Sequence, residues 1–201
     1  MPSDLIFLFD LDSTITKQEI LPTIARSVGK EEQMRMLTEE AMIGSVPFRD
    51  SFLSRVDLLK DVPVSEVSRA IAEIPVHEDL CRFMREHKDR CFIVTGNLDI
   101  WIDGLVERMG MKGNVYCSKG IVLDDRLLGV ASVIDKNLTV DQFVNPFVAV
   151  GDGSNDAEMI SRAQVGIGFG GVRAIAPSVL EVASHAIYDE GRLVQFLGRL
   201  L

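Results

Sequence analysis

The 201-residue chain is 47% hydrophobic and 25% charged, with a formal net charge of −9 at pH 7. These values describe a globular protein with one sizeable core, which excludes wholesale disorder. An acidic chain without a cluster of Lys and Arg also argues against a nucleic-acid backbone or an anionic membrane as a partner. An anionic substrate is not excluded, because a bound divalent cation can reverse the local field.

The remaining composition predicts a cytoplasmic protein. The N-terminal residues lack a basic segment followed by a long apolar region, and no uninterrupted apolar stretch is long enough to span a bilayer. The three cysteines, Cys81, Cys91 and Cys117, are widely spaced and could not all pair with one another. This usage favours a reducing compartment. The oligomeric state is left open by the sequence.

The chain opens with the apolar run 5–9, which is followed at once by Asp10 and two positions later by Asp12. A short apolar run that ends in acids predicts a buried strand that delivers carboxylates to a cleft. The alternative is a strand followed by a polar turn, in which Asp12 or Ser13 caps the next element. The cleft is favoured because the same arrangement recurs twice further along the chain.

Residues 16–75 change character, because strand-like runs are missing and apolar residues recur at helical spacing. We expect one helix with Ile20, Ile24 and Val28 on its apolar face, and a second over 31–42 that ends before Gly44. Two more helices are expected after Pro47 and after Pro63. The block is predicted to be a small helical domain, inserted into a core that comprises 1–15 and 76–201.

From residue 76 onward, helices and strands are predicted to alternate. Helices are expected over 78–86, 98–109, 139–144 and 191–200, with a further helix that Ser154 or Asn155 caps and that runs to about 163. Strands are expected over 91–94, 147–150, 165–169 and 185–187. The segment 115–134 is rich in β-branched residues and predicts short strands or a hairpin, with Asp124 and Asp125 at the turn. Such alternation predicts an α/β fold, with a Rossmann-like three-layer core around a mainly parallel sheet.

Three of the apolar runs end in polar residues, at 10–12, 95–96 and 151–156. In a parallel sheet these ends emerge at one edge, where open α/β folds bind ligands. Aspartates that meet there raise one another's pKa, and Mg²⁺ relieves this repulsion because it takes oxygen ligands. Thr95 and Gly96 lie before a helix and offer a hydroxyl and backbone N–H groups to an anion. Gly151 and Gly153 are expected to let the backbone turn tightly. A lysine, either Lys119 or Lys136, would complete the neutralisation of a phosphate.

With these motifs the sequence resembles the haloacid dehalogenase (HAD) superfamily of aspartyl-phosphate phosphatases, and within it the phosphoserine phosphatase subgroup. The resemblance covers nearly the whole chain and implies the HAD fold with a small inserted helical cap domain. It implies that Asp10 is the nucleophile, that Asp12 is the general acid and base, and that Lys136 holds the nucleophile and the phosphoryl group. The phosphate-binding residues that it implies are Ser13, Thr95, Gly96 and Lys136. The Mg²⁺ site that it implies consists of Asp10, the backbone carbonyl of Asp12, Asp152 and, in support, Asp156.

The resemblance extends to the substrate contacts of the helical block. Glu19 stands where the family binds an amino group, and Arg55 where it binds a carboxylate. Met42, Phe48 and Asn155 match further substrate-binding positions. Glu19 can meet an ammonium and Arg55 can clamp a carboxylate with two hydrogen bonds. The alternative is that both are ordinary charges on solvated helix faces.

Two departures from the subgroup pattern bear on the function. Asn97 stands where the subgroup has glycine, and the segment between Lys136 and Asp152 is short, which keeps Lys119 as an alternative catalytic lysine. We expect a Mg²⁺-dependent phosphomonoester hydrolase of a small phosphorylated metabolite, with L-phosphoserine as substrate. One alternative is hydrolysis or transfer of phosphate from another small ester. A second is a non-catalytic module that binds phosphate ligands, although such a module would not need Asp12.

Overall fold

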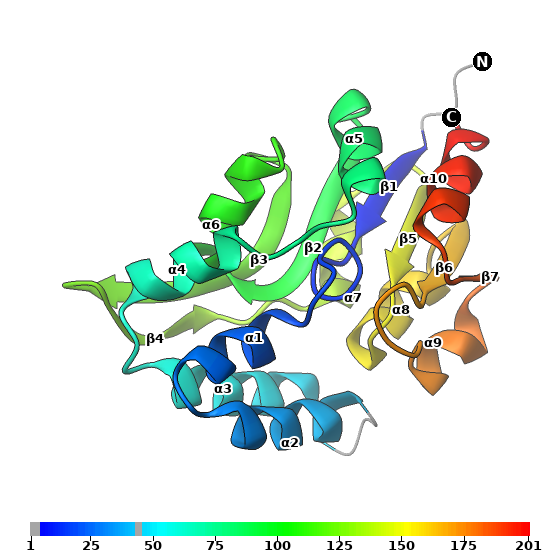
Figure 1. The fold of residues 1–201 in the computed structure, drawn as a ribbon. Coiled ribbons are helices and arrows are strands. Elements are labelled where there is room, and N and C mark those ends of the chain that lie inside the picture. Colours follow the sequence, from blue (N-terminus) through cyan, green and yellow to red (C-terminus); the bar gives the residue numbers. More distant parts are fainter. Residues whose placement is uncertain (1–4, 43–45) are drawn as a thin grey trace.

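The structure is a computed structural model (Figure 1). It describes residues 5–42 and 46–201, and for residues 40–42 it describes the backbone alone. Seven strands form one sheet in the order β4-β3-β2-β1-β5-β6-β7. The strands are β1 Ile6–Phe9, β2 Cys91–Leu98, β3 Val115–Leu123, β4 Arg126–Ser132, β5 Phe147–Gly151, β6 Val165–Phe169 and β7 His185–Ile187. All neighbouring strands are parallel except β3 and β4, which form an antiparallel hairpin. The predicted α/β fold with a mainly parallel sheet is therefore confirmed.

Helices cover both faces of this sheet. The helices of the described residues are α1 Ile20–Ser27, α2 Glu31–Met42, α3 Phe48–Leu59, α4 Val64–Ala72, α5 Glu78–Glu86, α6 Asp99–Arg108, α7 Lys136–Thr139, α8 Ala157–Ser161, α9 Pro177–Val182 and α10 Glu190–Gly198, with short 3₁₀ turns η1 Val140–Gln142 and η2 Ser154–Asp156. Alternate residues of β1 face opposite ways, as a strand requires. Phe7 and Phe9 join the core beneath α5, α6 and α10, whereas Leu8 joins a second core beneath η1, α8 and α9. Three layers result, and β1 is buried on both faces.

The helical block between β1 and β2 divides into two parts. Helices α1, α2 and α3 lie together below one edge of the sheet in Figure 1, whereas α4 lies along α6 of the core. The two helices approach closely because residue 104 is glycine: a Cβ there would lie 3.3 Å from the Cβ of Ala72. Helix α4 of the block therefore packs directly against the core.

The chain passes between core and block at two adjacent points. Thr16 and Val76 form an isolated antiparallel bridge. Beside it, the N–H of His77 donates to the carbonyl of Ile15 at 2.9 Å, and the N–H of Lys17 donates to that of Pro75 at 2.7 Å. The bridge lies at both predicted domain boundaries, and the division into 1–15, 16–75 and 76–201 stays a prediction.

The predicted hairpin is present, and its turn also fastens the block. Asp124 and Asp125 have φ values of 48° and 62°, the left-handed pair that a two-residue hairpin turn requires. The carboxylate of Asp125 then accepts hydrogen bonds from the N–H and the hydroxyl of Ser65 at 2.8 and 2.6 Å, which caps α4. The core hairpin is therefore tied to the helical block at its tip.

Three sequence expectations were wrong in detail. Strand β2 continues through Leu98, four residues past its predicted end, with a register shift against β3 between Thr95 and Leu98. The short helix expected over 139–144 begins at Lys136 instead, because Asp135 caps it and accepts from the N–H groups of Asn137 and Leu138. Helix α9 was not expected. Gly44, the predicted stop of α2, lies outside the described residues.

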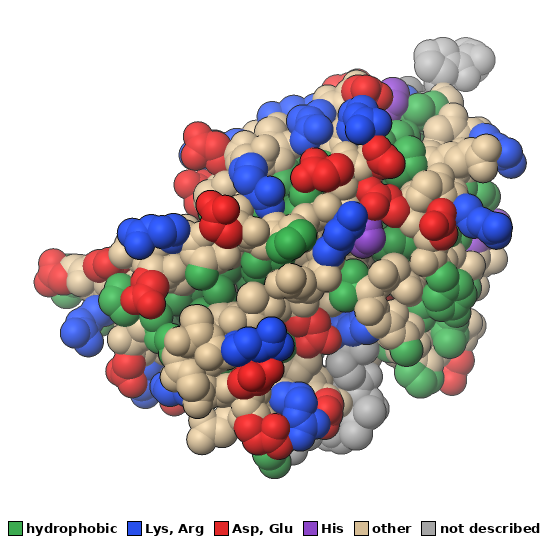
Figure 2. All heavy atoms as spheres, in the orientation of Figure 1, with side chains coloured by type: hydrophobic (Ala, Val, Ile, Leu, Met, Phe, Trp, Pro, Cys, Tyr) green, Lys and Arg blue, Asp and Glu red, His purple; other side chains and the backbone are tan. Residues whose placement is uncertain are grey.

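The surface carries both signs of charge. On the face drawn in Figure 2, Lys and Arg side chains are interspersed with Asp and Glu over core and block alike. Within the described ranges, the helices are all too short or too polar to cross a membrane.

Candidate active site

A cavity of about 60 Å³ opens at the carboxyl ends of β1, β2 and β5. The sheet and the segments that follow its strands contribute Asp10, Asp12, Thr95, Gly96, Asn97, Ser154 and Asn155 to its wall, and the helical block contributes Glu19, Leu21, Pro22, Thr38, Phe48, Phe52 and Arg55. The three polar strand ends predicted from the sequence do meet here.

Asp10 lies directly after β1 and is held by the core. Its N–H donates to the carbonyl of Val150 at 2.9 Å, and its carboxylate accepts a hydrogen bond from Lys136. Only 5% of the residue is exposed. Burial raises the pKa of Asp10 from 3.8 to about 7, although the ammonium of Lys136 opposes the shift. Because burial removes water from this carboxylate, its charged form gains more from a bound cation or an electrophile than a hydrated carboxylate would.

Lys136, and not Lys119, reaches the acids. The Lys136 ammonium is buried and donates to Asp10 and, at 2.6 Å, to Asp156. Burial alone would lower its pKa, but the two carboxylates outweigh burial and raise it, so the lysine is charged. Lys119 is exposed, and its ammonium lies 3.3 Å from the carboxylate of Asp99. The run 133–135 before Lys136 is not a strand; the helix start at residue 136 aims the side chain instead.

Asp156 organises the loop that follows β5. One of its oxygens accepts from Lys136, and the other accepts from the N–H groups of Asp152 and Gly153 at 3.1 and 2.9 Å. Glycine at position 151 leaves room for Asp156, because a Cβ there would lie 2.5 Å from the Asp156 carboxyl carbon. Gly153 has an ordinary φ of −91°. Neither glycine has a positive φ, and their turning role stays a prediction.

Three aspartates form a cluster that fits a hard cation. Asp10, Asp152 and Asp156 each offer an oxygen within 4.8 Å of the others, and all three are buried. Burial also raises the pKa of Asp152 to about 6, against the opposing guanidinium of Arg173. Carboxylate oxygens at this spacing match the ligand preference of Mg²⁺. The Asp12 carboxylate is not among the three; it accepts from the N–H of Ile20 at 2.9 Å, and burial raises its pKa to about 6.

Ser13 and Thr14 complete the loop after β1. Ser13 adopts a φ of 62°, which costs strain in a residue other than glycine, and its buried hydroxyl has no partner within the part of the chain that the structure describes. The hydroxyl of Thr14 donates to Asp152 at 3.1 Å and so ties β1 to β5. A strained backbone beside an unsatisfied hydroxyl is typical of a ligand site.

The second polar strand end holds Thr95 and Gly96. Both belong to β2, and helix α6 begins at Asp99 just after this strand, as predicted. Asn97 donates from both its backbone N–H and its side-chain amide to the Thr95 hydroxyl, each at 3.2 Å. A Cβ at Gly96 would lie only 2.3 Å from the Phe48 ring. Glycine is therefore required here because the helical block closes against it.

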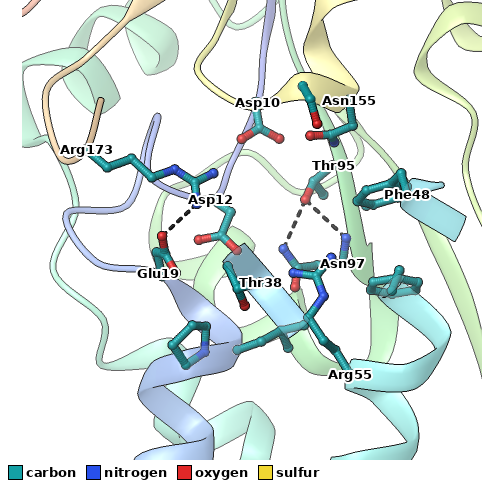
Figure 3. Close-up of a pocket in the computed structure, with 15 residues that line it drawn as sticks. Asp10, Asp12, Glu19, Thr38, Phe48, Arg55, Thr95, Asn97, Asn155 and Arg173 are labelled. Atoms are coloured by element: carbon teal, nitrogen blue, oxygen red, sulfur yellow. Dashed lines mark hydrogen bonds and ion pairs between the residues drawn. The ribbon is translucent and has the colours of Figure 1, made fainter. Parts of the chain in front are cut away.

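Two of the residues predicted to read the substrate, Glu19 and Arg55, lie across the cavity from Thr95 and Asp10 (Figure 3). Arg55 is 8% exposed, donates to the carbonyl of Ser51 at 3.3 Å, and lies 6.0 Å from the centre of the Phe48 ring. Burial lowers its pKa. The solvated-face alternative is thereby wrong for Arg55. Glu19 lies just before α1 and faces the cavity, as does Asn155 from η2, whereas the Met42 side chain lies outside the described residues.

Arg173 is a site residue that the sequence did not reveal. It lies after β6, in a tail without recognisable motifs, yet its guanidinium donates to Asp152 and, at 2.6 Å, to Glu19. Figure 3 shows it reaching across the cavity toward Asp12 and Glu19. The only sequence signal was an arginine after the glycine pair 170–171, close to the end of a strand. Thr38 of α2 was likewise missed as a lining residue.

Known proteins match this chain in sequence and in fold. Residues 7–161 match the family model of haloacid dehalogenase-like hydrolases. Phosphoserine phosphatase of Methanocaldococcus jannaschii is 33% identical over 82% of this chain and 84% of its own length. Phosphoserine phosphatase of Archaeoglobus fulgidus is also 33% identical over 82% of this chain, which spans only 52% of that relative.

Two solved structures resemble the whole fold. A phospho-aspartyl intermediate analogue of phosphoserine phosphatase superposes with a TM-score of 0.82 at 30% identity, covering 96% of this chain and 99% of that one. A substrate-bound phosphoserine phosphatase complex gives a TM-score of 0.80 at 29% identity with the same coverage.

Proposed function

Because the chain belongs to the haloacid dehalogenase-like hydrolases and, among them, to the phosphoserine phosphatases, we propose that it hydrolyses L-phosphoserine through an aspartyl phosphate on Asp10. The observation that carries this proposal is the buried Lys136 ammonium, which bridges Asp10 and Asp156 at the end of the cavity opposite Arg55. A phosphate at one end and an amino-acid reader at the other fit one small phosphorylated amino acid.

A Mg²⁺ ion is part of the proposal. Asp10 and Asp152 would hold it together with the Asp12 carbonyl, and Asp156, whose oxygens already serve Lys136 and two N–H groups, would support the site. Bound Mg²⁺ would neutralise the phosphoryl oxygens and so favour attack by an anionic nucleophile. The raised pKa values of Asp10 and Asp152 support the assignment, because crowded buried carboxylates gain most from a cation.

The chain's own residues then divide the reaction into two steps. Asp10 attacks phosphorus, the ester bond breaks, and Asp12 gives its proton to the leaving serine oxygen. Asp12 next takes a proton from the water that attacks the aspartyl phosphate, which releases inorganic phosphate and restores Asp10. A pKa of about 6 suits a group that gives and then accepts a proton near neutral pH.

Phosphate and amino acid would be held at opposite ends. The Thr95 hydroxyl, the N–H of Gly96, the Ser13 hydroxyl and Lys136 would bind phosphate oxygens, and the unsatisfied Ser13 hydroxyl supports this. Arg55 would clamp the carboxylate, with Phe48 and Met42 against the carbon chain and Asn155 near the ester. Three free cysteines support the proposed cytoplasmic location. A role in serine formation there is proposed from the product of the proposed reaction, which is serine.

Phosphate release from a panel of phosphomonoesters, with Mg²⁺ and with EDTA, tests the proposal. We expect phosphoserine to be turned over only with Mg²⁺. Arg55→Ala should lower kcat/KM for phosphoserine about 100-fold, because a bidentate guanidinium contact is lost, and should leave p-nitrophenyl phosphate unchanged. Arg49→Ala, an exposed residue of the same helix, is the matched control. Unchanged phosphoserine turnover in Arg55→Ala would show that Arg55 does not read the substrate.

A further inference from the structure

Arg173 lies at the end of the cavity that is lined by Glu19 and Arg55, which we call the organic end. Its position there affects which substrate groups this end needs to bind. Its guanidinium lies 2.6 Å from the carboxylate that is proposed to meet the substrate's ammonium, that of Glu19. The two side chains are 22% and 28% exposed, so the pair is largely withdrawn from water. Glu19 therefore already has a cationic partner before any substrate enters.

Arg173 is fixed in this position. Its Nε donates to Asp152, which is fully buried, and the carbonyl of Asp152 in turn accepts from the N–H of Ala176 at 2.8 Å. Both contacts attach the loop after β6 to the loop after β5. The guanidinium is thus held over Glu19 by core elements, and it does not depend on the substrate for its place.

Asp12 also faces this end but is assigned to proton transfer at the ester oxygen, and the other three charged side chains, Glu19, Arg173 and Arg55, add up to one cation. Arg55 has no ion pair among the described residues, whereas Glu19 and Arg173 neutralise each other. The other acid that Arg173 contacts, Asp152, belongs to the cation cluster. One unpaired guanidinium matches a substrate whose organic end carries one carboxylate and no ammonium.

We propose that Arg173 makes the α-amino group optional, so that the enzyme also hydrolyses phosphate monoesters of short hydroxy carboxylic acids that lack it. A site built around a buried polar group rejects analogues that leave this group unpaired, by about 10⁴- to 10⁵-fold. Here an analogue without the ammonium leaves Glu19 paired with Arg173, which removes the main cause of rejection.

The reaction is the one proposed above and needs no further reactant. The P–O bond to the hydroxy acid breaks, Asp10 takes the phosphoryl group, and the departing oxygen receives the proton of Asp12. Water then transfers its oxygen to phosphorus. The inference rests on the proposed function and broadens its substrate class.

The test compares phosphoserine with the O-phosphate of 3-hydroxypropanoate, which is phosphoserine with hydrogen in place of the amino group. For the wild type we expect a kcat/KM ratio between the two esters below about 100. Arg173→Gln should raise the preference for phosphoserine at least about 10-fold, because Glu19 is then left without its internal partner. Glu19→Gln should shift the preference at least about 10-fold the other way, because Arg173 then repels an ammonium.

Arg26→Gln is the matched control, since it breaks an exposed Arg–Glu pair in the same helical block and should leave the ratio unchanged. Calorimetric binding of both esters to Asp10→Asn, with and without Arg173→Gln, gives the same comparison without turnover. A wild-type ratio above 100, or a ratio that Arg173→Gln and Glu19→Gln both leave unchanged, would overturn the inference. If the wild type released phosphate from neither ester, the proposed function itself would fail.

Discussion

The two ends of the cavity are built in different ways. At the phosphate end, Asp10, Asp152, Asp156 and Lys136 come from the core and are almost fully buried. Lys136 donates to Asp10 and Asp156, and the Asp152 carboxylate accepts from Thr14 and Arg173. At the organic end, Arg55 and Glu19 come from the helical block, and Arg173 comes from a loop 154 positions beyond Glu19. The sheet topology fixes the positions of the residues at the phosphate end. The positions at the organic end depend on how the helical block, the core and the loop after β6 pack together. Substitutions at the phosphate end should therefore lower the rate of the reaction, and substitutions at the organic end should change the substrate preference.

The largest expected effect comes from the nucleophile. Asp10→Asn should lower kcat for phosphoserine at least about 10⁴-fold, because no aspartyl phosphate can form on an amide. Rapid-quench labelling with radioactive phosphoserine should trap a phosphoenzyme in the wild type and none in the variant. Asp103→Asn, which removes an exposed acid beside Lys112, is the control and should retain full activity. A labelled Asp10→Asn enzyme would place the nucleophile elsewhere.

The next effect distinguishes the two candidate lysines. Lys136→Met should lower kcat about 10²- to 10⁴-fold, because the developing phosphoryl charge loses its cation. It should also lower the free energy of unfolding by about 3–5 kcal/mol without Mg²⁺, since two buried carboxylates lose their partner. Steady-state kinetics and urea unfolding measure the two effects. Lys119→Met, at an exposed site, should change neither. The reverse pattern would assign catalysis to Lys119.

A smaller effect is expected at the contact between Gly96 of the core and Phe48 of the helical block. A Cβ at Gly96 would lie 2.3 Å from the Phe48 ring, so Gly96→Ala should hold the helical block away from the core. We expect KM for phosphoserine to rise about 10-fold, because Phe48 and the nearby Arg55 are displaced together. Gly113→Ala meets no atom within 4 Å but strains a φ of 91°, and so controls for folding alone. If Phe48→Ala failed to relieve the Gly96→Ala defect, the clash would not be its cause.

The phosphate end could be predicted from sequence because its signals are local. An apolar run of four or five residues is long enough to indicate a buried strand, and parallel strands bring their carboxyl ends together whatever the loops do. Asp10, Thr95 and Asp152 follow from that rule alone. The rule does not give backbone detail: strand β2 passes through Thr95 and Gly96, and the glycines near Asp152 make room for the Asp156 carboxylate.

The organic end was predicted only in part, because its contacts are tertiary. Glu19 and Arg55 carry no periodic signal and were identified through the resemblance to a family. Arg173 lies in a segment without pattern, and its role depends on the packing of β6 beside β5, which places the loop next to Asp152. No local property of the sequence 170–176 distinguishes this arginine from a solvated one.

The smallest expected effect is a dependence of metal stabilisation on pH. Burial raises the pKa of Asp10 to about 7 and those of Asp12 and Asp152 to about 6, all above the ordinary 3.8. Their contribution to stability is therefore fully present below about pH 4 and is lost as pH rises through 6 to 7 in the metal-free protein. A divalent cation binds the ionised carboxylates, so it should restore stability over the same window.

Melting in excess Mg²⁺ and in EDTA, at equal ionic strength, should show this difference. A cation present at about 10 times its Kd stabilises by about 1.4 kcal/mol, which for a chain of this size raises Tm by about 3–6 °C. We expect this shift at pH 8 and less than half of it at pH 5. Asp152→Asn should flatten the dependence, whereas Asp103→Asn should not. An equal or larger Mg²⁺ shift at pH 5 would mean that the cation binds outside the aspartate cluster, and the phosphate end would then lose its proposed metal.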